Sequence, residues 1–389
     1  MPKVVGIICE YNPFHKGHKY QIDQVRAKEP DATIVAIMSG NIVQRGEFAL
    51  FGKYDRAKIA LECGANAVFE MPYPYSGSCA EIFANAGVTI ANGLGCDSIF
   101  FGIERLSLSE LEAIAQEIDG ERFKVEVAAI MQDKSVSYIS AREKAIANMG
   151  YEAPKYANDM LALEYIRAIK KKRLPIGYDA IKRVGAFYND DSFGDIMSAS
   201  AIRKHFYEKG EIVSVPDCAI NLYDEIIKSG RYVDSLRADA ILHTYCLLNS
   251  LEKQRIFDTS PEMVALIKNV CVDACSGEDF MSRLSSKAFT TARLRRSLLY
   301  AMLGVKEVDF EPQFAVLLGM DAKGKALLND IKKKSELTII TKHSDGKELS
   351  DTAKEMLETL YRVDSIYYAL LCDKSTPMDA YKNKPILKS

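Results

Sequence analysis

Residues 4–18 read VVGIICEYNPFHKGH, and this stretch decides the fold. Its first part, Val4–Cys9, is a short apolar run with no basic region ahead of it, which predicts a buried strand rather than a leader peptide. Pro13 and Gly17 then break the chain into a turn, and residues that favour a helix follow. A strand, a turn and a helix in this order indicate the first βα unit of an α/β protein.

Strand-like and helix-like segments keep alternating beyond this unit. Apolar strands are expected at Thr33–Met38, Ala67–Glu70 and Ser98–Phe101, and helical patterns occupy Tyr54–Cys63 and Glu81–Leu94 between them. Strands separated by helix-length segments predict βαβ units and a mostly parallel sheet. Such a sheet binds its ligand beyond the carboxyl ends of its strands.

The pattern changes after about residue 206. Apolar residues then recur at spacings of three and four, as at Leu294 and Leu298, and Leu337–Thr341 is the clearest strand pattern that remains. We therefore expect an α/β catalytic domain over residues 1–206, followed by a mainly α-helical domain over residues 207–389.

The composition argues against several classes of protein. Of the 389 residues, 48% are apolar, which is enough for a sizeable core, and no stretch is long enough to span a bilayer. The nine cysteines are scattered without a CxxC pair, which argues against a zinc site and favours a reducing, cytoplasmic compartment. We expect no zinc, no haem and no membrane association. The net charge of −2 argues against bulk electrostatic binding to nucleic acid but leaves room for a local basic patch.

The strongest chemical signal is the pair His15 and His18 around Gly17, at the start of the first predicted helix. A helix N-terminus offers free amides and a positive dipole end to a phosphate. Two imidazoles add donors that follow charge onto the α-phosphate during attack, and Gly17 leaves room for the nucleotide to come close. The alternative is two surface histidines at a helix start. The position directly after the first strand, in a chain with five histidines, favours function.

A second signal, SASAIR at Ser198–Arg203, starts another predicted helix at the end of the α/β region. Serines are ordinary helix caps, so capping alone is the plain interpretation. The same residues can also clamp phosphate, because Ser198 and Ser200 offer hydroxyls beside free amides and Arg203 offers a guanidinium. The HxGH pair in the same domain favours the clamp.

Together the two motifs resemble the nucleotidylyltransferases, which share HxGH with class I aminoacyl-tRNA synthetases. In that superfamily the histidines contact the α-phosphate region and a serine–arginine turn holds the outer phosphates. The resemblance implies a Rossmann-like HxGH domain here. Most members have SS or ST at the turn, whereas this chain has SAS. Ser198 and Ser200 are therefore both candidates for the phosphate contact.

Longer motifs resemble the bacterial tRNA(Met) cytidine acetate ligase family over nearly the whole chain. They are GIICEYNPFHKGHKYQI, MSGNIVQRGEFALFGKYDRAKIAL, GANAVFEMPYPYS, FFGIE and, in the helical half, KAFTTARLRR at Lys287–Arg296. The resemblance implies an enzyme that uses ATP, accompanied by Mg²⁺, to activate acetate as acetyl-adenylate. It then acetylates N4 of the wobble cytidine of elongator tRNA(Met). The implied ATP-contacting positions are Ile7, Ile8, Cys9, Glu10, Tyr11, Asn12, Pro13, Phe14, His15, Lys16, Gly17, His18, Lys19, Tyr20, Gly102, Asn158 and Arg183.

The loop after the second predicted strand should also face the ligand edge of the sheet. We therefore expect the acetate or cytosine pocket among Ser39, Gly40, Asn41, Gln44 and Arg45. Arg45 is the cation we expect first beside a carboxylate, and a solvated loop arginine is the alternative.

Arg293 and Arg296 lie one helical turn apart and share a helix face in the second domain. Two cations on one face suit the backbone of a tRNA. Ion pairing within the domain is an equally weighted alternative.

Two other functions fit the same motifs. A small-molecule adenylyltransferase of the HxGH superfamily leaves AMP on its product and forms no pyrophosphate with acetate. An RNA-binding protein with a degenerate nucleotide site is the other, and the intact His15, Gly17, His18 and Arg203 argue against it. Nothing in the sequence indicates an obligatory protein partner or defines the acyl group.

Overall fold

The computed structural model describes residues 2–133, 136, 138–183, 196–286, 288–309, 311–373 and 380–388. Lys287, at the start of the motif in the helical half, lies outside the described residues. The elements, in chain order, are β1 (Val4–Cys9), α1 (Lys16–Lys28), β2 (Thr33–Ser39), β3 (Ile42–Val43), β4 (Glu47–Phe48), α2 (Lys53–Glu62), β5 (Ala67–Met71), α3 (Ala80–Gly93), β6 (Ser98–Ile103), α4 (Leu108–Glu117), α5 (Glu121–Ile130), α6 (Tyr138–Asn148), α7 (Ala157–Lys172), β7 (Gly177–Lys182), α8 (Ala199–Lys209), α9 (Asp217–Lys228), α10 (Ser235–Leu248), α11 (Pro261–Asp273), α12 (Gly277–Arg283), α13 (Thr291–Leu303), β8 (Phe314–Met320), α14 (Ala322–Lys334), β9 (Thr338–Ile340), α15 (Asp351–Ala369) and β10 (Ile386–Leu387).

A parallel sheet in the order β5-β2-β1-β6-β7 forms the centre of the molecule. Every residue of β2 and β5 is buried. Because successive side chains of a strand point to opposite faces, both faces of these strands are covered. The α/β class and the mostly parallel sheet are confirmed, and the strand order reverses direction between β1 and β6, where such sheets bind ligands.

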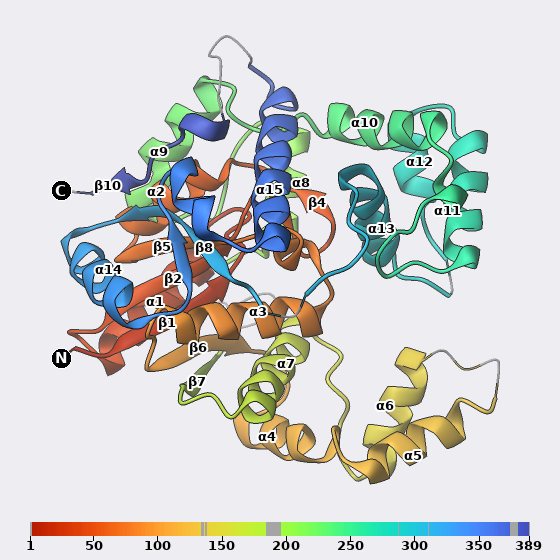
Figure 1. Ribbon diagram of the computed structural model, residues 1–389, viewed down its shortest axis with the longest axis horizontal. Coiled ribbons are helices and arrows are strands. Elements are labelled where there is room, and N and C mark those ends of the chain that lie inside the picture. The colour runs from red at the N-terminus through yellow and green to blue at the C-terminus, as the bar shows by residue number, and fades with distance from the viewer. Residues whose placement is uncertain are drawn as a thin grey trace.

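The sequence predicts a separate helical domain over residues 207–389, but the structure divides this half of the chain differently. Strand β8 pairs antiparallel with β5, and both β9 and β10 pair with β8, so residues far beyond 206 complete the central sheet. The part that stands apart is smaller and consists of α10–α13, to the right of the sheet in Figure 1. The sequence of β8, FAVLLGM, is a continuous apolar run, and periodicity alone cannot distinguish such a strand from a buried helix segment.

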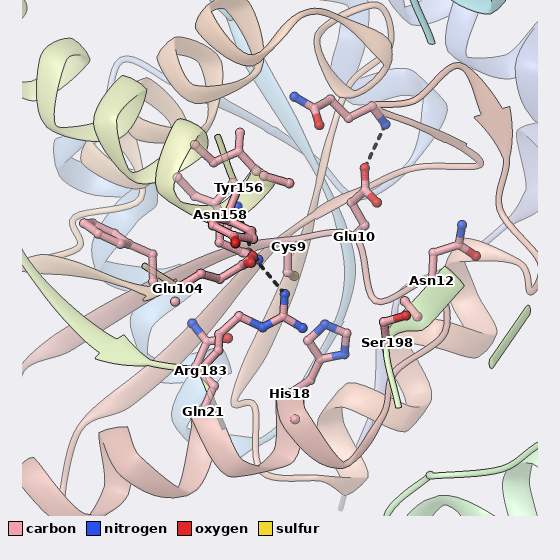
Figure 2. A pocket seen from close by; sticks show the side chains of 18 of the residues that line it. Cys9, Glu10, Asn12, His18, Gln21, Glu104, Tyr156, Asn158, Arg183 and Ser198 are labelled. Atoms are coloured by element: carbon pink, nitrogen blue, oxygen red, sulfur yellow. Dashed lines mark hydrogen bonds and ion pairs between the residues drawn. The ribbon is translucent and has the colours of Figure 1, made fainter. Parts of the chain in front are cut away.

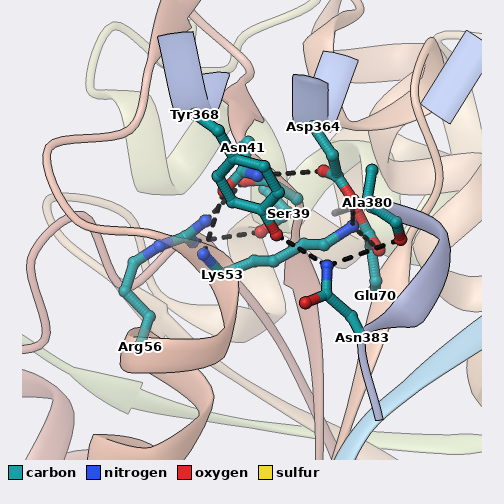
Figure 3. A network of polar contacts seen from close by, with 10 residues as sticks. Ser39, Asn41, Lys53, Arg56, Glu70, Asp364, Tyr368, Ala380 and Asn383 are labelled. Atoms are coloured by element: carbon teal, nitrogen blue, oxygen red, sulfur yellow. Dashed lines mark hydrogen bonds and ion pairs between the residues drawn. The ribbon is translucent and has the colours of Figure 1, made fainter. Parts of the chain in front are cut away.

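A buried ionic cluster joins α15 to the sheet (Figure 3). Lys53 Nζ lies 2.7 Å from Glu70 Oε2 and 2.6 Å from Asp364 Oδ2, and all three side chains are at most 2% exposed. Asn41 donates its amide to Asp364 Oδ1 over 2.9 Å. Although burial alone would lower it, Asp364 and Glu70 hold the pKa of Lys53 well above its usual value. The cluster therefore fixes the loop after β2 against a helix more than three hundred residues later.

Among the described residues, no helix combines the length and apolar character needed to cross a lipid bilayer. The same residues contain no group of three or more His, Cys, Asp or Glu side chains arranged to hold a metal ion.

Candidate active site

A cavity of about 920 Å³ opens at the point where the strand order reverses. Its wall combines residues from the carboxyl ends of β1, β6 and β7 with the turn between β3 and β4. The N-termini of α1, α7 and α8 also border it. Three positive helix-dipole ends at one cavity suit a polyanion such as a triphosphate.

The two histidines at the start of α1 hold each other in one tautomer. His15 caps the helix, and its Nδ1 accepts the Gly17 N–H over 3.0 Å. His18 Nδ1 accepts the His15 backbone N–H over 3.2 Å. A neutral imidazole that accepts at Nδ1 carries its proton on Nε2. Both rings, stacked with centroids 3.8 Å apart, therefore present Nε2–H donors.

Both histidines are neutral at physiological pH. Burial, and next the nearby Arg183, lower the pKa of His15 to about 3. Burial also lowers the pKa of His18 well below its usual value, with smaller contributions from His15 and Arg183. The pair therefore supplies directed hydrogen-bond donors rather than positive charge, and the cations of the site come from arginines.

Gly17 has a different structural reason from the one expected. A Cβ added at this position would lie 2.9 Å from His15 Cε1 and 3.1 Å from His15 Nδ1. The glycine therefore leaves room for the His15 imidazole that caps the helix. It affects a bound nucleotide only indirectly, through the position of that ring.

The SASAIR turn caps α8 and also borders the cavity. Ser198 is the N-cap of α8, and its hydroxyl accepts the Ala201 N–H over 3.2 Å. Ser200 lines the cavity, and its hydroxyl has no hydrogen-bond partner among the described residues. Arg203 donates to the Asn12 carbonyl over 2.8 Å, which joins α8 directly to the HxGH loop. Its guanidinium also lies 3.3 Å from Glu47 Oε2. Ser200 is thus the better placed of the two serines for a phosphate.

Asn158 and Arg183 meet around a carboxylate that the sequence did not single out, Glu104 (Figure 2), and Gly102 lies beside Arg183. Glu104 Oε1 accepts the Asn158 backbone N–H over 3.3 Å and also the Asn158 side-chain amide. Arg183 Nη1 lies 3.5 Å from the same oxygen. A Cβ on Gly102 would lie 3.1 Å from Arg183 Cγ, so the glycine lets this arginine cross the end of β6. Asn158 is not the cap of α7, because Tyr156 occupies that position.

The loop that carries Glu104 is held by a second carboxylate missing from the sequence prediction. Asp159 is fully buried, and its two oxygens accept the backbone N–H groups of Glu104, Arg105 and Leu106 over 2.6, 2.9 and 3.2 Å. An acidic residue in the first turn of a helix is a common sequence signal. Nothing in its spacing indicates that it supports the loop after β6.

Most of the implied ATP-contacting positions border the cavity. Ile7 lies inside the sheet, Phe14 lies in the core, and Pro13, Lys16 and Lys19 are also absent from the wall. The implied positions that do line the cavity are Ile8, Cys9, Glu10, Tyr11, Asn12, His15, Gly17, His18, Tyr20, Gly102, Asn158, Arg183, Ser198, Ser200 and Arg203.

Only some of the residues expected to form the acetate or cytosine pocket line the cavity. Gln44 and Arg45 line it, and Arg45 forms no hydrogen bond or ion pair with the described residues. Ser39, Gly40 and Asn41 do not line it. The physical reason is that the Lys53 cluster covers this loop, where a Cβ on Gly40 would lie 2.0 Å from Glu70 Oε1.

Comparisons with known proteins agree with this geometry. A family model described as HIGH Nucleotidyl Transferase matches residues 2–383. The tRNA(Met) cytidine acetate ligase of Thermoanaerobacter sp. (strain X514) is 34% identical, with 98% of this chain and 96% of the relative covered. That of Acetivibrio thermocellus is 31% identical, with 96% of each covered. The chain belongs to the tRNA(Met) cytidine acetate ligase family of HIGH nucleotidyl transferases.

A crystal structure from the same family has the same fold. Thermotoga maritima TmcAL, described as bound with alpha-thio ATP, superposes with a TM-score of 0.90 at 26% identity and covers 99% of both chains. Its apo form superposes with a TM-score of 0.91 at 27% identity. The resemblance inferred from the motifs is confirmed at the level of family and fold.

The two arginines of α13 make contacts inside this family member. Arg293 lies 2.7 Å from Asp258 Oδ1 and over the ring of Phe289. Arg296 is 9% exposed and donates to the Gln44 carbonyl over 3.3 Å. The neighbouring Arg295 forms an ion pair with Glu47. Ion pairing within the helical half, the alternative left open by the pattern, occurs for Arg293, whereas Arg296 makes a hydrogen bond to the β3–β4 turn.

Proposed function

We propose that the chain is an ATP-dependent ligase that activates acetate as acetyl-adenylate and transfers the acetyl group to N4 of the wobble cytidine of elongator tRNA(Met). The observation that carries the proposal is the pair of neutral, Nε2-protonated histidines at a cavity bordered by three helix N-termini. Full-length similarity to relatives named for this reaction supports the choice of reaction.

In the first half-reaction an oxygen of acetate attacks the α-phosphorus of ATP, and pyrophosphate leaves. The Nε2–H groups of His15 and His18 donate to the α-phosphate oxygens as negative charge develops on them. Arg203 and Ser200 contact the departing phosphates, and Arg203 must share its guanidinium between them and Glu47.

Magnesium would accompany the triphosphate and neutralise charge on the leaving pyrophosphate. This ion keeps several waters and needs only one or two carboxylates beside the substrate phosphates. Few carboxylates line the cavity, and most of them are paired with cations. This lining fits a magnesium ion that is held chiefly by the nucleotide phosphates.

Acetate needs a cation close to the α-phosphate. We assign this role to Arg45, which lines the cavity without another partner among the described residues. In the second half-reaction the cytosine N4, whose lone pair is delocalised into the ring, attacks the carbonyl carbon of the mixed anhydride and AMP leaves. No covalent protein nucleophile is required, and exclusion of water protects the anhydride.

The helical part, α10–α13, is our proposed contact for the tRNA, with Arg293 as its first candidate because this side chain is 39% exposed. Arg296 acts there only through the position of α13, since it is buried. A reducing cytoplasm is the compartment that we propose, in keeping with nine free cysteines.

Mass analysis of nucleosides tests the proposal most directly. Elongator tRNA(Met) is incubated with the protein, ATP, Mg²⁺ and isotope-labelled acetate, digested and analysed. We expect one labelled N4-acetylcytidine per tRNA, together with AMP and pyrophosphate. A small-molecule adenylyltransferase, the alternative function, would produce neither labelled nucleoside nor acetate-dependent pyrophosphate.

A further inference from the structure

Glu10 is an acid where the proposed reaction needs cations. It follows β1 directly, lines the same cavity as the HxGH pair, and is labelled in Figure 2. A carboxylate at this position repels both the triphosphate and acetate. Its presence therefore points to a partner other than these anions.

Among the described residues, three carboxylates border the cavity, and two of them are already paired. Glu104 receives the Asn158 amides and lies beside Arg183. Glu47 lies between Arg203 and Arg295.

Glu10 accepts only the backbone N–H of Gln44, over 2.8 Å, at its Oε1. Its Oε2 has no hydrogen-bond or ion-pair partner among the described residues. The structure therefore leaves one acceptor oxygen available at the cavity, held in place by a backbone contact to the β3–β4 turn.

A cytosine presents its N4 amino group as a hydrogen-bond donor, and Glu is one of the residues that accept from it. Uracil presents an acceptor oxygen at the same position, which a carboxylate repels. On the basis of the proposed function, we propose that Glu10 binds the N4 amino group of the acetyl-accepting cytosine and removes its proton during transfer.

The step balances without another reactant. The N4 lone pair forms the bond to the acetyl carbon while the carbonyl π electrons move to oxygen. Collapse of this intermediate breaks the bond to AMP, which leaves with that electron pair, and the N4 proton passes to Glu10 Oε2. Burial raises the pKa of Glu10, and the charge of Glu47 adds to this, while the Gln44 N–H and the charges of Arg203 and Arg45 act in the opposite direction. The pKa stays raised on balance, which makes the carboxylate a stronger proton acceptor than an exposed glutamate.

The test compares the two half-reactions in Glu10→Gln. The glutamine carbonyl can still accept the Gln44 N–H. Its NH₂ group, however, is a hydrogen-bond donor that would face the N4 amino group, which is also a donor, so the two cannot form a hydrogen bond. We expect acetyl transfer to fall about a hundredfold or more beyond any change in pyrophosphate formation from ATP and acetate. Wild-type transfer should also lose rate at acidic pH, as Glu10 protonates, whereas pyrophosphate formation should not follow that profile.

Glu10→Asp keeps an acid and serves as the rescue variant, with more transfer than Glu10→Gln and the same acidic loss of rate. Glu104→Gln is the matched carboxylate change, and we expect it to weaken ATP use in the first half-reaction. Thermal unfolding of each variant shows that the fold is intact.

Three outcomes would overturn the assignment. Wild-type transfer by Glu10→Gln would remove Glu10 from the reaction. Equal loss of both half-reactions in folded protein, or a changed Mg²⁺ dependence of pyrophosphate formation, would place it with ATP instead. Failure of wild-type protein to form pyrophosphate with acetate would instead refute the proposed function, and this inference with it.

Discussion

At the scale of single residues, the site depends on hydrogen bonds that fix two imidazole tautomers. His15 and His18 each accept a backbone N–H at Nδ1, so the loop itself directs both Nε2–H groups into the cavity. Burial keeps the rings neutral. A short motif therefore specifies its own protonation state as well as its position.

His15→Asn separates the cap from the chemistry. Asparagine is a preferred N-cap whose Oδ1 can accept the Gly17 N–H as Nδ1 does now, but it has no donor in the place of Nε2–H. We expect unfolding at neutral pH to change little, and acetate-dependent pyrophosphate formation to fall by about 10²–10³. Chemical denaturation and a pyrophosphate assay measure the two effects. Near wild-type pyrophosphate formation would remove His15 from the α-phosphate.

The same variant tests the pH dependence of stability. The pKa of His15 in the folded protein is lowered from 6.5 to about 3. Below pH 6.5 the unfolded chain binds a proton that the folded chain does not, so the free energy of unfolding falls as pH decreases. Each pH unit costs up to about 1.4 kcal/mol. Urea unfolding at pH 7.5 and pH 5 should show wild type losing about 2 kcal/mol relative to His15→Asn. If the difference in unfolding free energy between wild type and His15→Asn were the same at both pH values, His15 would bind a proton as readily in the folded chain as in the unfolded chain.

The residues of the site were predictable from sequence only where chemistry is carried by an unusual motif. HxGH and the serine–arginine turn stand out by type and spacing, and both border the cavity. Glu104 ends the FFGIE motif and Asp159 is a single acid in an ordinary context, and their roles depend on β6 lying beside α7, which no local pattern encodes. Ser39, Gly40 and Asn41 do not border the cavity because distant residues cover their loop: Arg56 donates to the carbonyls of Ser39 and Gly40, and Asp364 of α15 accepts the Asn41 amide.

At the scale of elements, the β3–β4 turn packs directly against α13. Gly46 adopts a φ of +72°, and a Cβ there would lie 2.7 Å from the backbone nitrogen of Arg296. The Arg295–Glu47 ion pair and the Arg296–Gln44 hydrogen bond join the same two elements. The helical part is thereby positioned by a turn that also contributes Gln44 and Arg45 to the cavity.

Gly46→Ala tests this contact, with Gly95→Ala as its control. Gly95 has nearly the same φ, +71°, but its missing side chain faces open space. The left-handed conformation alone costs a non-glycine residue about 1–2 kcal/mol. We expect Gly95→Ala to lose that much stability, and Gly46→Ala to lose more and also to reduce acetyl transfer. If Gly46→Ala and Gly95→Ala lose the same unfolding free energy in denaturant, the added methyl group at position 46 moves the turn away from α13 at no energetic cost.

The alternation of elements was predictable in the first half because each strand there is short, apolar and bounded by glycine or proline. β1, β2, β5 and β6 all lie within one or two residues of their expected positions. The C-terminal return of the chain was not predictable, since pairing of β8 with β5 is a contact between distant segments. Local patterns specify elements, whereas packing decides which of them share a sheet.

At the scale of the whole molecule, the Lys53 cluster holds the C-terminal helix to the nucleotide-binding sheet. Lys53→Met keeps the length of the side chain but leaves Glu70 and Asp364 buried without their cation. We expect a loss of about 3–5 kcal/mol in the free energy of unfolding. Lys354→Met, which removes an exposed cation 3.8 Å from Asp351 on the same helix, should change it by less than about 0.5 kcal/mol. Similar values for the two variants would contradict a structural role for the cluster.

Arg293→Ala tests whether the helical part binds tRNA while the sheet carries the site of acetate activation. If Arg293 contacts a tRNA phosphate, the variant should bind tRNA more weakly and with a salt slope lower by about one. Acetate-dependent pyrophosphate formation without tRNA should stay unchanged. Asp258→Ala, which removes the ion-pair partner of Arg293, is the control. Unchanged tRNA binding in Arg293→Ala, with both variants equally destabilised, would make the pair purely structural.

The antiparallel pairing of β8 with β5 also has a consequence for synthesis on the ribosome. At about 5–20 residues per second, the chain between Met71 and Phe314 takes roughly 12–50 s to emerge. Throughout that interval the outer edge of β5 has no neighbour, and open edges invite pairing with other nascent chains. Glu70, the fourth of the five residues of β5, is the kind of inward charge that discourages such pairing. We therefore expect the residue that is linked to α15 through Lys53 in the finished fold to disfavour pairing of the open β5 edge before β8 emerges.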